Sequence, residues 1–397
     1  MRIGVLPGYR YPASLDEPLT CGDLRNSFNL SRALARAGES VVVVTRRRRG
    51  DPQSQTVDGV VVRRYRPELG RVFPTSFDIS PRRQRLFDEL TRDVDVVVTS
   101  TPLTLELLTP KRAPMVYVCS GLEDIRNYGA TTGETLQGLG IRLLRDPAKR
   151  RSWVRADRVN TTAELEAATL LRLGVPHERI LTIGPGVEIE RYVPMPRAGV
   201  ETFRRAFLPQ AGDKRVVLSV SRFTPAKGIL ETLRAFARLA ARRPDVFLVL
   251  AGVRHSHRSG YFEQVRRTIA SLGLERDVAI LENLPEAQLP LCYSAATVTS
   301  VFSVGYDPLP TTIIESMACG TPVVATDFAP RAQMITHDQN GVLVPERDET
   351  AWVAAVDRVL ADDGHAARLR DAGLARVRAQ FDMNRVAQRY LEAFRSL

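Results

Sequence analysis

Two stretches of the sequence combine charged side chains with helix starts in a way that suits an anionic ligand. The first is "SRFTPAKG" at 221–228, which follows the apolar run "RVVLSV" and precedes an amphipathic stretch. Arg222 and Lys227 would then lie at the carboxyl end of a strand, where cations are well placed to hold phosphate oxygens. Two solvated loop cations would explain the same spacing, so this motif alone is weakly specific.

The second stretch is "GYDPLPTTIIESMACGTPVVAT" at 305–326, where two acids, Asp307 and Glu315, surround a proline-rich helix start. Proline is tolerated in a first helical turn, so free N–H groups of Thr311 and Thr312 would point out of the helix end. Such an end favours anionic oxygens, typically by about 0.3–1 kcal/mol. Glu315 lies on the same helix face as Thr311. The alternative is that Asp307 only caps the helix and Glu315 is only a solvated side chain.

These motifs lie within a regular alternation of short apolar runs and amphipathic stretches. "RIGVL", "SVVVVT" and "DVVVTS" are typical of strands, as are "VFLVLAG" and "PVVAT" later in the chain. The alternation indicates parallel sheets wound with helices, while the Gly- and Pro-rich segment 183–199 indicates a linker. We therefore expect an α/β protein with two Rossmann-like domains, 1–186 and 187–380, facing each other across a cleft. The last helix, at about 381–397, would close the second domain or cross back to the first.

Composition places the chain among ordinary globular proteins. Of the 397 residues, 44% are hydrophobic and 25% are charged. No apolar run reaches about 18 residues, which predicts that no helix spans a membrane. The start "MRIGVLPG" enters a strand without a cleavable leader and favours a cytoplasmic location. The cysteines lack CxxC spacing and are interpreted as reduced structural thiols; they are Cys21, Cys119, Cys292 and Cys319.

The net charge of +11 comes almost entirely from arginine. It suits an anionic ligand or membrane surface, but an arginine-rich composition would produce it equally. The arginines are not interleaved with aromatic residues on one element, which disfavours nucleic-acid binding. The basic segment 141–158 fits an anionic lipid surface, although Pro147 interrupts it and a solvated helix face is the favoured interpretation.

Taken in order, the two charged motifs resemble the nucleotide-binding half of retaining glycosyltransferases of family 4, which have the GT-B fold. The family pattern at the acidic site is Glu-Pro-Phe-Gly-x4-Glu-Ala-x-Ala-x-Gly-x-Pro-Val, and this chain has "DPLPTTIIESMACGTPV". The linker "IGPGVEIERYVP" and "NGVLVP" at 340–345 are also similar to family segments. The resemblance covers nearly the whole chain. It implies transfer of a hexose-type sugar from a nucleotide-diphosphate sugar to an acceptor hydroxyl, with retention of the anomeric configuration.

The resemblance also implies a role for each matching residue. Arg222 and Lys227 match the cations that neutralise the donor diphosphate, and Asp307 matches the acid that holds hydroxyls of the transferred sugar. These three are the catalytic candidates. Glu315 matches the acid that binds the ribose hydroxyls. The other donor-binding candidates are Gly22 in the first domain and Ser221, Asn283, Leu309, Pro310, Thr311 and Thr312 in the second.

Several departures from the family pattern fall at the sugar site. Asp307 is one methylene shorter than the family glutamate, and Pro310 replaces a glycine and cannot donate an N–H. Ala329 and Pro330 stand where the family has Gly-Gly, and Ser120 where it often has histidine. The resemblance therefore implies an intact diphosphate clamp but leaves the sugar open.

We expect no metal cofactor, since the resemblance implies that cationic side chains take the place of a metal. We expect UDP rather than GDP as the nucleotide of the donor. His255 and His257 form an HxH sequence, but no acid or cysteine cluster supports a metal site. Ser120 lacks the G-x-S-x-G context of a hydrolase nucleophile.

The resemblance assigns the acceptor to loops of the first domain, here 7–22 and 119–129. A small molecule, a cell-envelope glycan or a lipid-linked acceptor would fit, the last with peripheral contact at the cytoplasmic face of the membrane. Two rivals remain: a sugar-nucleotide-binding protein without transfer, and a nucleotide-sugar epimerase. The polar acceptor candidates, each of which could equally be an ordinary exposed loop residue, are Asp16, Ser120, Glu123, Asp124 and Arg126.

Overall fold

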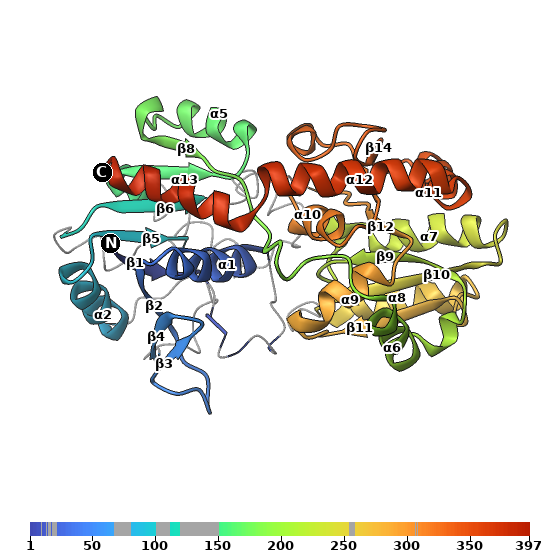
Figure 1. The fold of residues 1–397 in the computed structure, drawn as a ribbon, viewed down its shortest axis with the longest axis horizontal. Helices are drawn as coiled ribbons and strands as arrows, with labels where there is room; N and C mark the ends of the chain where they lie inside the picture. Colours follow the sequence, from blue (N-terminus) through green and yellow to red (C-terminus); the bar gives the residue numbers. More distant parts are fainter. Residues whose placement is uncertain are drawn as a thin grey trace. The chain divides into compact units, whose positions relative to one another are not determined.

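The chain forms two compact units of the α/β class (Figure 1). Unit 1 is built from described residues of Met1–Ser14, Cys21–Gly186 and Met383–Leu397, and unit 2 mainly from Val187–Asp382. The computed structural model describes residues 1–8, 10–12, 14, 17, 22–66, 81–100, 112–119, 151–253, 259–305, 307 and 309–397.

Unit 1 contains an eight-stranded sheet in the order β3-β4-β2-β1-β5-β6-β7-β8. All pairs are parallel except β3–β4, a hairpin whose turn residues Asp58 and Gly59 both have positive φ, at 49° and 82°. The central strands are valine-rich and buried, as expected for parallel strands covered on both faces. The strands are β1 (Arg2–Leu6), β2 (Ser40–Arg46), β3 (Ser54–Val57), β4 (Val60–Tyr65), β5 (Val96–Thr99), β6 (Met115–Cys119), β7 (Arg158–Thr161) and β8 (Ile180–Thr182).

The last helix, α13 (Met383–Arg395), packs in unit 1 against α1 (Gly22–Arg36) (Figure 1). Asn160 of β7 fastens it there. Its Nδ2 donates to Tyr390 Oη of α13 at 2.9 Å and to Ile183 O at 3.1 Å, and its Oδ1 accepts from Ile183 N at 2.9 Å. The other described helical parts of unit 1 are α2 (Pro81–Arg92), residues 151–155, α5 (Glu164–Arg172) and the 3₁₀ turn η2 (His177–Arg179).

Unit 2 contains a six-stranded, fully parallel sheet in the order β11-β10-β9-β12-β13-β14. The chain builds outward from β9 in one direction and then from β12 in the other. The strand order therefore reverses between β9 and β12, and in open α/β sheets this switch point is where ligands bind, outside the carboxyl ends of the strands. The strands are β9 (Arg215–Val220), β10 (Val246–Gly252), β11 (Val278–Glu282), β12 (Val298–Val301), β13 (Val323–Thr326) and β14 (Val342–Val344).

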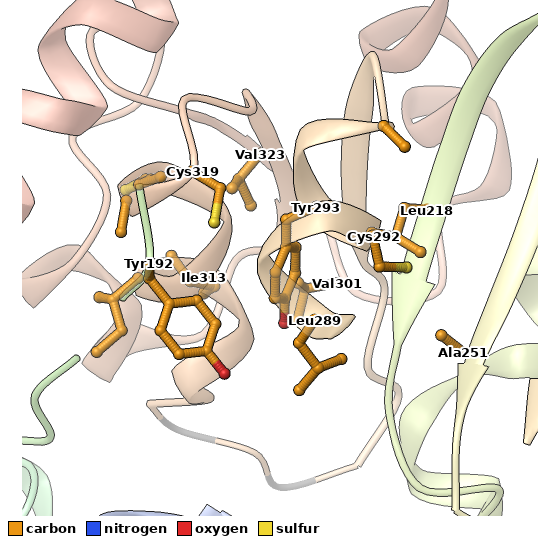
Figure 2. Close-up of a cluster of buried hydrophobic side chains, with 14 of the residues drawn as sticks. Tyr192, Leu218, Ala251, Leu289, Cys292, Tyr293, Val301, Ile313, Cys319 and Val323 are labelled. Atoms are coloured by element: carbon orange, nitrogen blue, oxygen red, sulfur yellow. The ribbon is translucent and has the colours of Figure 1, made fainter. Parts of the chain in front are cut away.

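Helices cover both faces of this sheet because successive strand residues point to opposite sides. Leu218 of β9 joins one buried cluster with Tyr293 and Ile313 (Figure 2), and the preceding Val217 joins the other with Trp352. The helices of unit 2 are α6 (Arg197–Phe207), α7 (Ile229–Ala240), α8 (Ser259–Ser271), α9 (Leu289–Ser294), α10 (Thr311–Ala318), α11 (Glu349–Ala361) and α12 (Asp363–Gln380). The 3₁₀ turns are η3 (Pro209–Ala211), η4 (Pro225–Lys227), η6 (Glu286–Gln288) and η7 (Ala329–Gln333).

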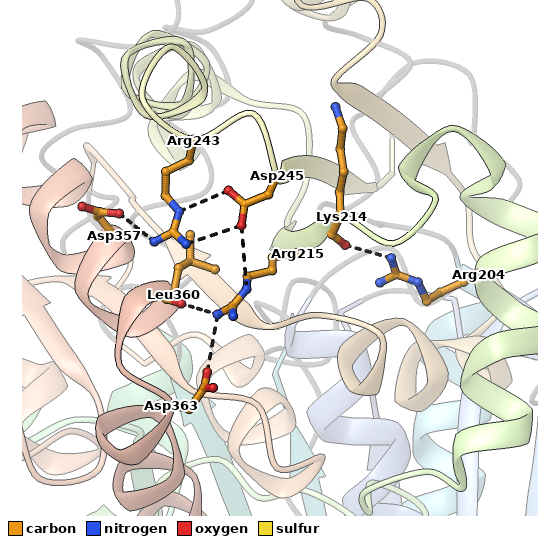
Figure 3. A network of polar contacts seen from close by, with 8 residues as sticks. All are labelled: Arg204, Lys214, Arg215, Arg243, Asp245, Asp357, Leu360 and Asp363. Carbon is orange, nitrogen blue, oxygen red and sulfur yellow. Dashed lines mark hydrogen bonds and ion pairs between the residues drawn. The ribbon is translucent and has the colours of Figure 1, made fainter.

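A polar network connects the amino ends of strands in this sheet to α11 and α12 (Figure 3). Arg243 donates to Asp245 Oδ1 at 3.3 Å and to Asp357 Oδ1 of α11 at 3.0 Å. Arg215, the first residue of β9, donates to Leu360 O and lies 3.5 Å from Asp363 Oδ1. These arginines hold helices to the sheet at the amino ends of its strands, opposite the carboxyl ends.

Cys119, Cys292 and Cys319 are buried and form no disulfide within the described residues, and burial raises the pKa of the Cys292 thiol to about 12. Cys21 lies outside the described residues. No helix within the described ranges combines enough length with enough apolar character to pass through a lipid bilayer. Of the basic segment 141–158, residues 151–155 are helical, and 141–150 lie outside the described part.

Replacing Asn160 with alanine should destabilise unit 1, since the buried Ile183 O would lose its side-chain donor and Ile183 N would keep only Thr161 O as an acceptor. We expect Asn160→Ala to lower the free energy of unfolding by roughly 2–4 kcal/mol, measured by urea denaturation. Tyr390→Phe removes one of the three hydrogen bonds and should cost about 1 kcal/mol. A loss in Asn160→Ala no larger than in Tyr390→Phe would contradict this account.

Candidate functional site

The candidate site lies at the carboxyl ends of the parallel strands of unit 2, where the loop after β9 contacts the loop after β12. Val304 N and Gly305 N both donate to Ala226 O, at 3.0 and 3.1 Å. Gly228 has a φ of +64°, and a Cβ there would lie 2.0 Å from Phe302 O. Only glycine permits this approach, which brings η4 against the loop that follows β12.

This contact joins Lys227 and Asp307 in an ion pair. Lys227 Nζ lies 2.7 Å from Asp307 Oδ1, and the two side chains are only 16% and 14% exposed. Burial raises the pKa of Asp307, but the charges of Lys227 and Arg331 outweigh it and hold that pKa at about 2. Burial lowers the pKa of Lys227. The negative charge of Asp307 partly offsets this decrease, and the positive charge of Arg222 adds to it. Asp307 is therefore a carboxylate at neutral pH, and its attraction to Lys227 opposes the loss of that ammonium's charge.

The structure adds two partners of Asp307 that the sequence motifs did not identify. Ser303 Oγ donates to Asp307 Oδ2 at 2.7 Å. Arg331 of η7 has a fully buried side chain, and its Nη2 donates to Asp307 O at 3.0 Å and lies 3.5 Å from Oδ2. The available signal was a charged residue in the apolar segment "DFAPRAQMI" directly after a buried strand.

Arg222 and Ser221 extend directly from the end of β9. Arg222 is half-buried, and no ion pair of its guanidinium occurs within the described ranges. Ser221 N donates to Ala251 O at 2.9 Å, and a Cβ on Gly252 would lie 1.8 Å from Ser221 O. The two strand ends therefore lie in close contact, which fixes the backbone at Ser221.

Helix α10 begins next to this pair. Pro310 is its N-cap residue and no side chain caps the helix, so Asp307 is not a capping residue. Thr312 Oγ1 donates to Val220 O of β9 at 3.1 Å and thereby ties the helix start to the switch point. Thr311 is half-buried, and Leu309 packs against the core. Among the residues that the structure describes, no side chain caps the amino end of α10, which suits an anionic ligand.

Glu315 lies one turn into α10 and is only 1% exposed. Its Oε2 accepts a hydrogen bond of 2.7 Å from the hydroxyl of Tyr293, a fully buried residue of α9. This burial excludes the interpretation of Glu315 as a solvated side chain. The sequence predicted that Glu315 shares a helix face with Thr311 but gave no indication of its partner Tyr293.

The remaining donor candidates lie elsewhere. Asn283 directly follows β11, the outermost strand on one side of the sheet, and its side chain is exposed. Its φ is 56°, and its backbone N–H donates to Gly252 O at 2.8 Å. Gly22 is the first residue of α1 in unit 1. Several predicted site residues lie outside the described part of the chain: the acceptor candidates Asp16, Ser120, Glu123, Asp124 and Arg126 and the pair His255 and His257. Within the described residues, no group of three or more His, Cys, Asp or Glu side chains could hold a metal ion.

Two family models match the chain. The model "Glycosyl transferases group 1" matches residues 200–376, and "Glycosyl transferase 4-like domain" matches residues 27–186. The first match contains the whole Lys227–Asp307–Glu315 region.

The chain is similar to bacterial proteins along most of its length. It is 31% identical to a D-inositol 3-phosphate glycosyltransferase of Acidothermus cellulolyticus over 360 residues, which are 86% of this chain and 78% of that protein. It is 27% identical over 303 residues to a GDP-mannose-dependent alpha-(1-6)-phosphatidylinositol monomannoside mannosyltransferase of Mycolicibacterium smegmatis, 74% of each chain. A match at 33% identity to a D-inositol 3-phosphate glycosyltransferase of Thermobispora bispora spans 60% of this chain and just over half of that protein, 56%.

Solved structures share the fold. Sucrose-phosphate synthase (tll1590) from Thermosynechococcus elongatus superposes with a TM-score of 0.80 at 24% identity, covering 100% of this chain and 98% of that one. Anabaena Alr3699/HepE in complex with UDP and glucose gives 0.76 at 18% identity and covers both chains fully. The predicted fold class is thereby confirmed as two Rossmann-like domains in a GT-B arrangement. The matched models and relatives together show that the chain belongs to glycosyltransferase family 4 and is a bacterial glycosyltransferase.

Proposed function

We propose that this glycosyltransferase moves a hexose-type sugar from a nucleotide-diphosphate sugar to an acceptor hydroxyl, with retention of the anomeric configuration. The observation that carries the donor class is the meeting of Arg222, Lys227 and the uncapped start of α10 at the β9–β12 switch point. Two side-chain cations and a helix amino end converging on one strand edge suit a diphosphate.

Each part of the donor would have its own protein partner. Arg222, Lys227 and the N–H groups of Thr311 and Thr312 would hold the diphosphate. Glu315, one turn further into α10, would accept hydrogen bonds from the ribose, and Asp307 would accept them from the transferred sugar. Both acids are held by neighbouring hydroxyls, from Tyr293 and Ser303. A carboxylate already held by a fixed donor presents its remaining acceptor sites in a defined direction.

In the proposed mechanism the sugar–phosphate bond stretches while the cations and the helix end stabilise the charge that builds on the leaving diphosphate. One preorganised donor of this kind is worth ~10²–10³ in rate. The acceptor hydroxyl attacks from the face that the diphosphate leaves, and a diphosphate oxygen takes its proton. No protein nucleophile is then needed. We expect no metal requirement, because side-chain cations neutralise the diphosphate.

The names of two relatives support a class of acceptor. The relatives from Acidothermus and Mycolicibacterium are named for an inositol phosphate and for a phosphatidylinositol mannoside, both polyhydroxylated. We propose a polyhydroxylated acceptor in a cell-envelope glycan, a glycolipid or a secondary metabolite. We propose UDP as the donor nucleotide, which the fold relative HepE binds, with GDP as the alternative named for the Mycolicibacterium relative. A cytoplasmic location with peripheral membrane contact remains a prediction.

The direct test is a transfer assay. The purified protein is incubated with UDP- and GDP-hexoses and a panel of inositol, glycan and glycolipid acceptors, and the product's anomeric configuration is read by NMR. We expect nucleoside diphosphate to be released only when an acceptor is present and the anomeric configuration of the donor to be kept. Release that does not depend on acceptor, isomerised donor without transfer, or an inverted product would contradict the proposal.

The diphosphate clamp can be tested with single substitutions. Lys227→Ala and Arg222→Ala should each lower kcat/KM by about 10²-fold or more, since each removes one preorganised cation at the leaving group. Arg242→Ala, which removes an exposed arginine after α7, is the matched control and should leave turnover unchanged. Wild-type turnover in either clamp variant would remove that residue from the mechanism.

Substitutions of the two acids, Glu315 and Asp307, should change different quantities. Glu315→Gln should weaken nucleoside-diphosphate binding because the ribose loses a charged acceptor, which is worth roughly tenfold in affinity. Asp307→Asn should lower kcat while nucleoside-diphosphate affinity, measured by calorimetry, changes little. The reverse pattern would exchange the two assignments.

A further inference from the structure

Arg331 is a buried cation that the proposed catalytic scheme does not use. It lies on η7, directly after β13, and its side chain is 0% exposed. Its guanidinium packs over the Phe328 ring, with 4.8 Å from Cζ to the ring centroid. A fully buried arginine is costly unless its donors are well matched, so its hydrogen-bond partners indicate what it is for.

The guanidinium joins three segments at the carboxyl edge of the sheet. Its Nη1 donates to Thr326 O at the end of β13, at 2.7 Å, and lies 3.3 Å from Val301 O at the end of β12. Its Nη2 donates to the backbone O of Asp307 at 3.0 Å and approaches the carboxylate Oδ2 at 3.5 Å. Four acceptors on two nitrogens fix the planar fork in place.

Lys227 is held quite differently. Its ammonium is a point charge on a flexible four-carbon stem, and within the described residues Asp307 is the one ion-pair partner of its Nζ. Rotation of that stem breaks one contact, whereas moving Arg331 would break contacts to two strand ends and a loop. Of the two cations that share Asp307, Lys227 is therefore the one that can move.

Asp307 has two cations in direct contact, Lys227 and Arg331. The charge of Arg222 also acts on Lys227, and those of Asp327 and Glu346 act on Arg331. Burial lowers the pKa of Arg331 to about 10, still well above neutrality, so the guanidinium stays charged. Asp307 therefore keeps a cationic partner when Lys227 turns away. Without Arg331, the same movement would leave a largely buried carboxylate without a cation, which is strongly unfavourable.

We propose that Arg331 is a positioning residue that acts as the permanent counter-ion of Asp307, and thereby allows Lys227 to leave Asp307 for the diphosphate of the donor. The inference rests on the proposed function of Lys227 as a diphosphate ligand. In this proposal Arg331 would contact neither the diphosphate nor the sugar. Its effect reaches the ligand through Asp307 and Lys227.

The test is a double-mutant cycle read as nucleoside-diphosphate affinity. UDP and GDP are titrated calorimetrically into the wild type, Arg331→Gln, Asp307→Asn and the double variant, and melting temperatures check that each variant is folded. Glutamine keeps neutral donors for the strand-end carbonyls but removes the charge. We expect Arg331→Gln to weaken binding roughly tenfold in the wild-type background, because Asp307 then retains Lys227. In the Asp307→Asn background the same change should alter affinity by no more than about twofold.

A purely structural role for Arg331 gives a different result. If the arginine only shapes the loops, Arg331→Gln weakens binding equally with and without Asp307, and the inference is wrong. It is equally wrong if Arg331→Gln binds like the wild type.

Arg331→Lys provides a second test if Arg331→Gln does not fold. Lysine keeps the charge beside Asp307, so affinity should stay within about threefold of the wild type. A folded Arg331→Lys variant that loses tenfold or more would contradict a counter-ion role. A wild type that binds neither UDP nor GDP would instead refute the proposed donor, a failure visible before any variant is made.

Discussion

The ion pair between Lys227 and Asp307 joins the loops after β9 and β12, the two strands between which the order of the unit 2 sheet reverses. A parallel sheet brings its carboxyl ends to one edge, but only the close approach at Gly228 brings these two side chains to hydrogen-bonding distance. Every other polar group of the site is placed relative to this pair. Ser303 and Arg331 hold the carboxylate, Arg222 repels the ammonium, and α10 starts four residues after Asp307.

Arginines at the two ends of the unit 2 strands have different surroundings. At the amino edge, Arg215 and Arg243 are matched by Asp245, Asp357 and Asp363, so their charges are used to hold helices (Figure 3). At the carboxyl ends of the strands, Asp307 lies between the cations Lys227 and Arg331, and the charge of Arg222 also acts on Lys227. The net charge of the chain therefore says little about ligand binding, whereas the local balance at each edge says a great deal.

The sequence predicts those features that depend on neighbouring residues. The alternation of valine-rich runs and amphipathic stretches predicts the parallel α/β units, and the prolines before Thr311 predict where α10 begins, because both signals are local. The ion pair of Lys227 with Asp307 and the burial of Arg331 are different, since they depend on loops that are distant in sequence. Periodicity likewise placed Glu315 on a helix face, but only packing shows that Tyr293 covers it.

The two oxygens of Asp307 are used unequally, and this couples the two halves of donor recognition. Oδ2 is held by Ser303 and approached by Arg331, whereas Oδ1 is held by Lys227. In the proposed function, a diphosphate that draws Lys227 away also releases Oδ1, which can then accept a hydrogen bond from a hydroxyl of the sugar. A nucleoside diphosphate alone would leave that oxygen to water. An intact donor satisfies both the ammonium and the carboxylate, so the site favours the substrate over the nucleotide product that must leave.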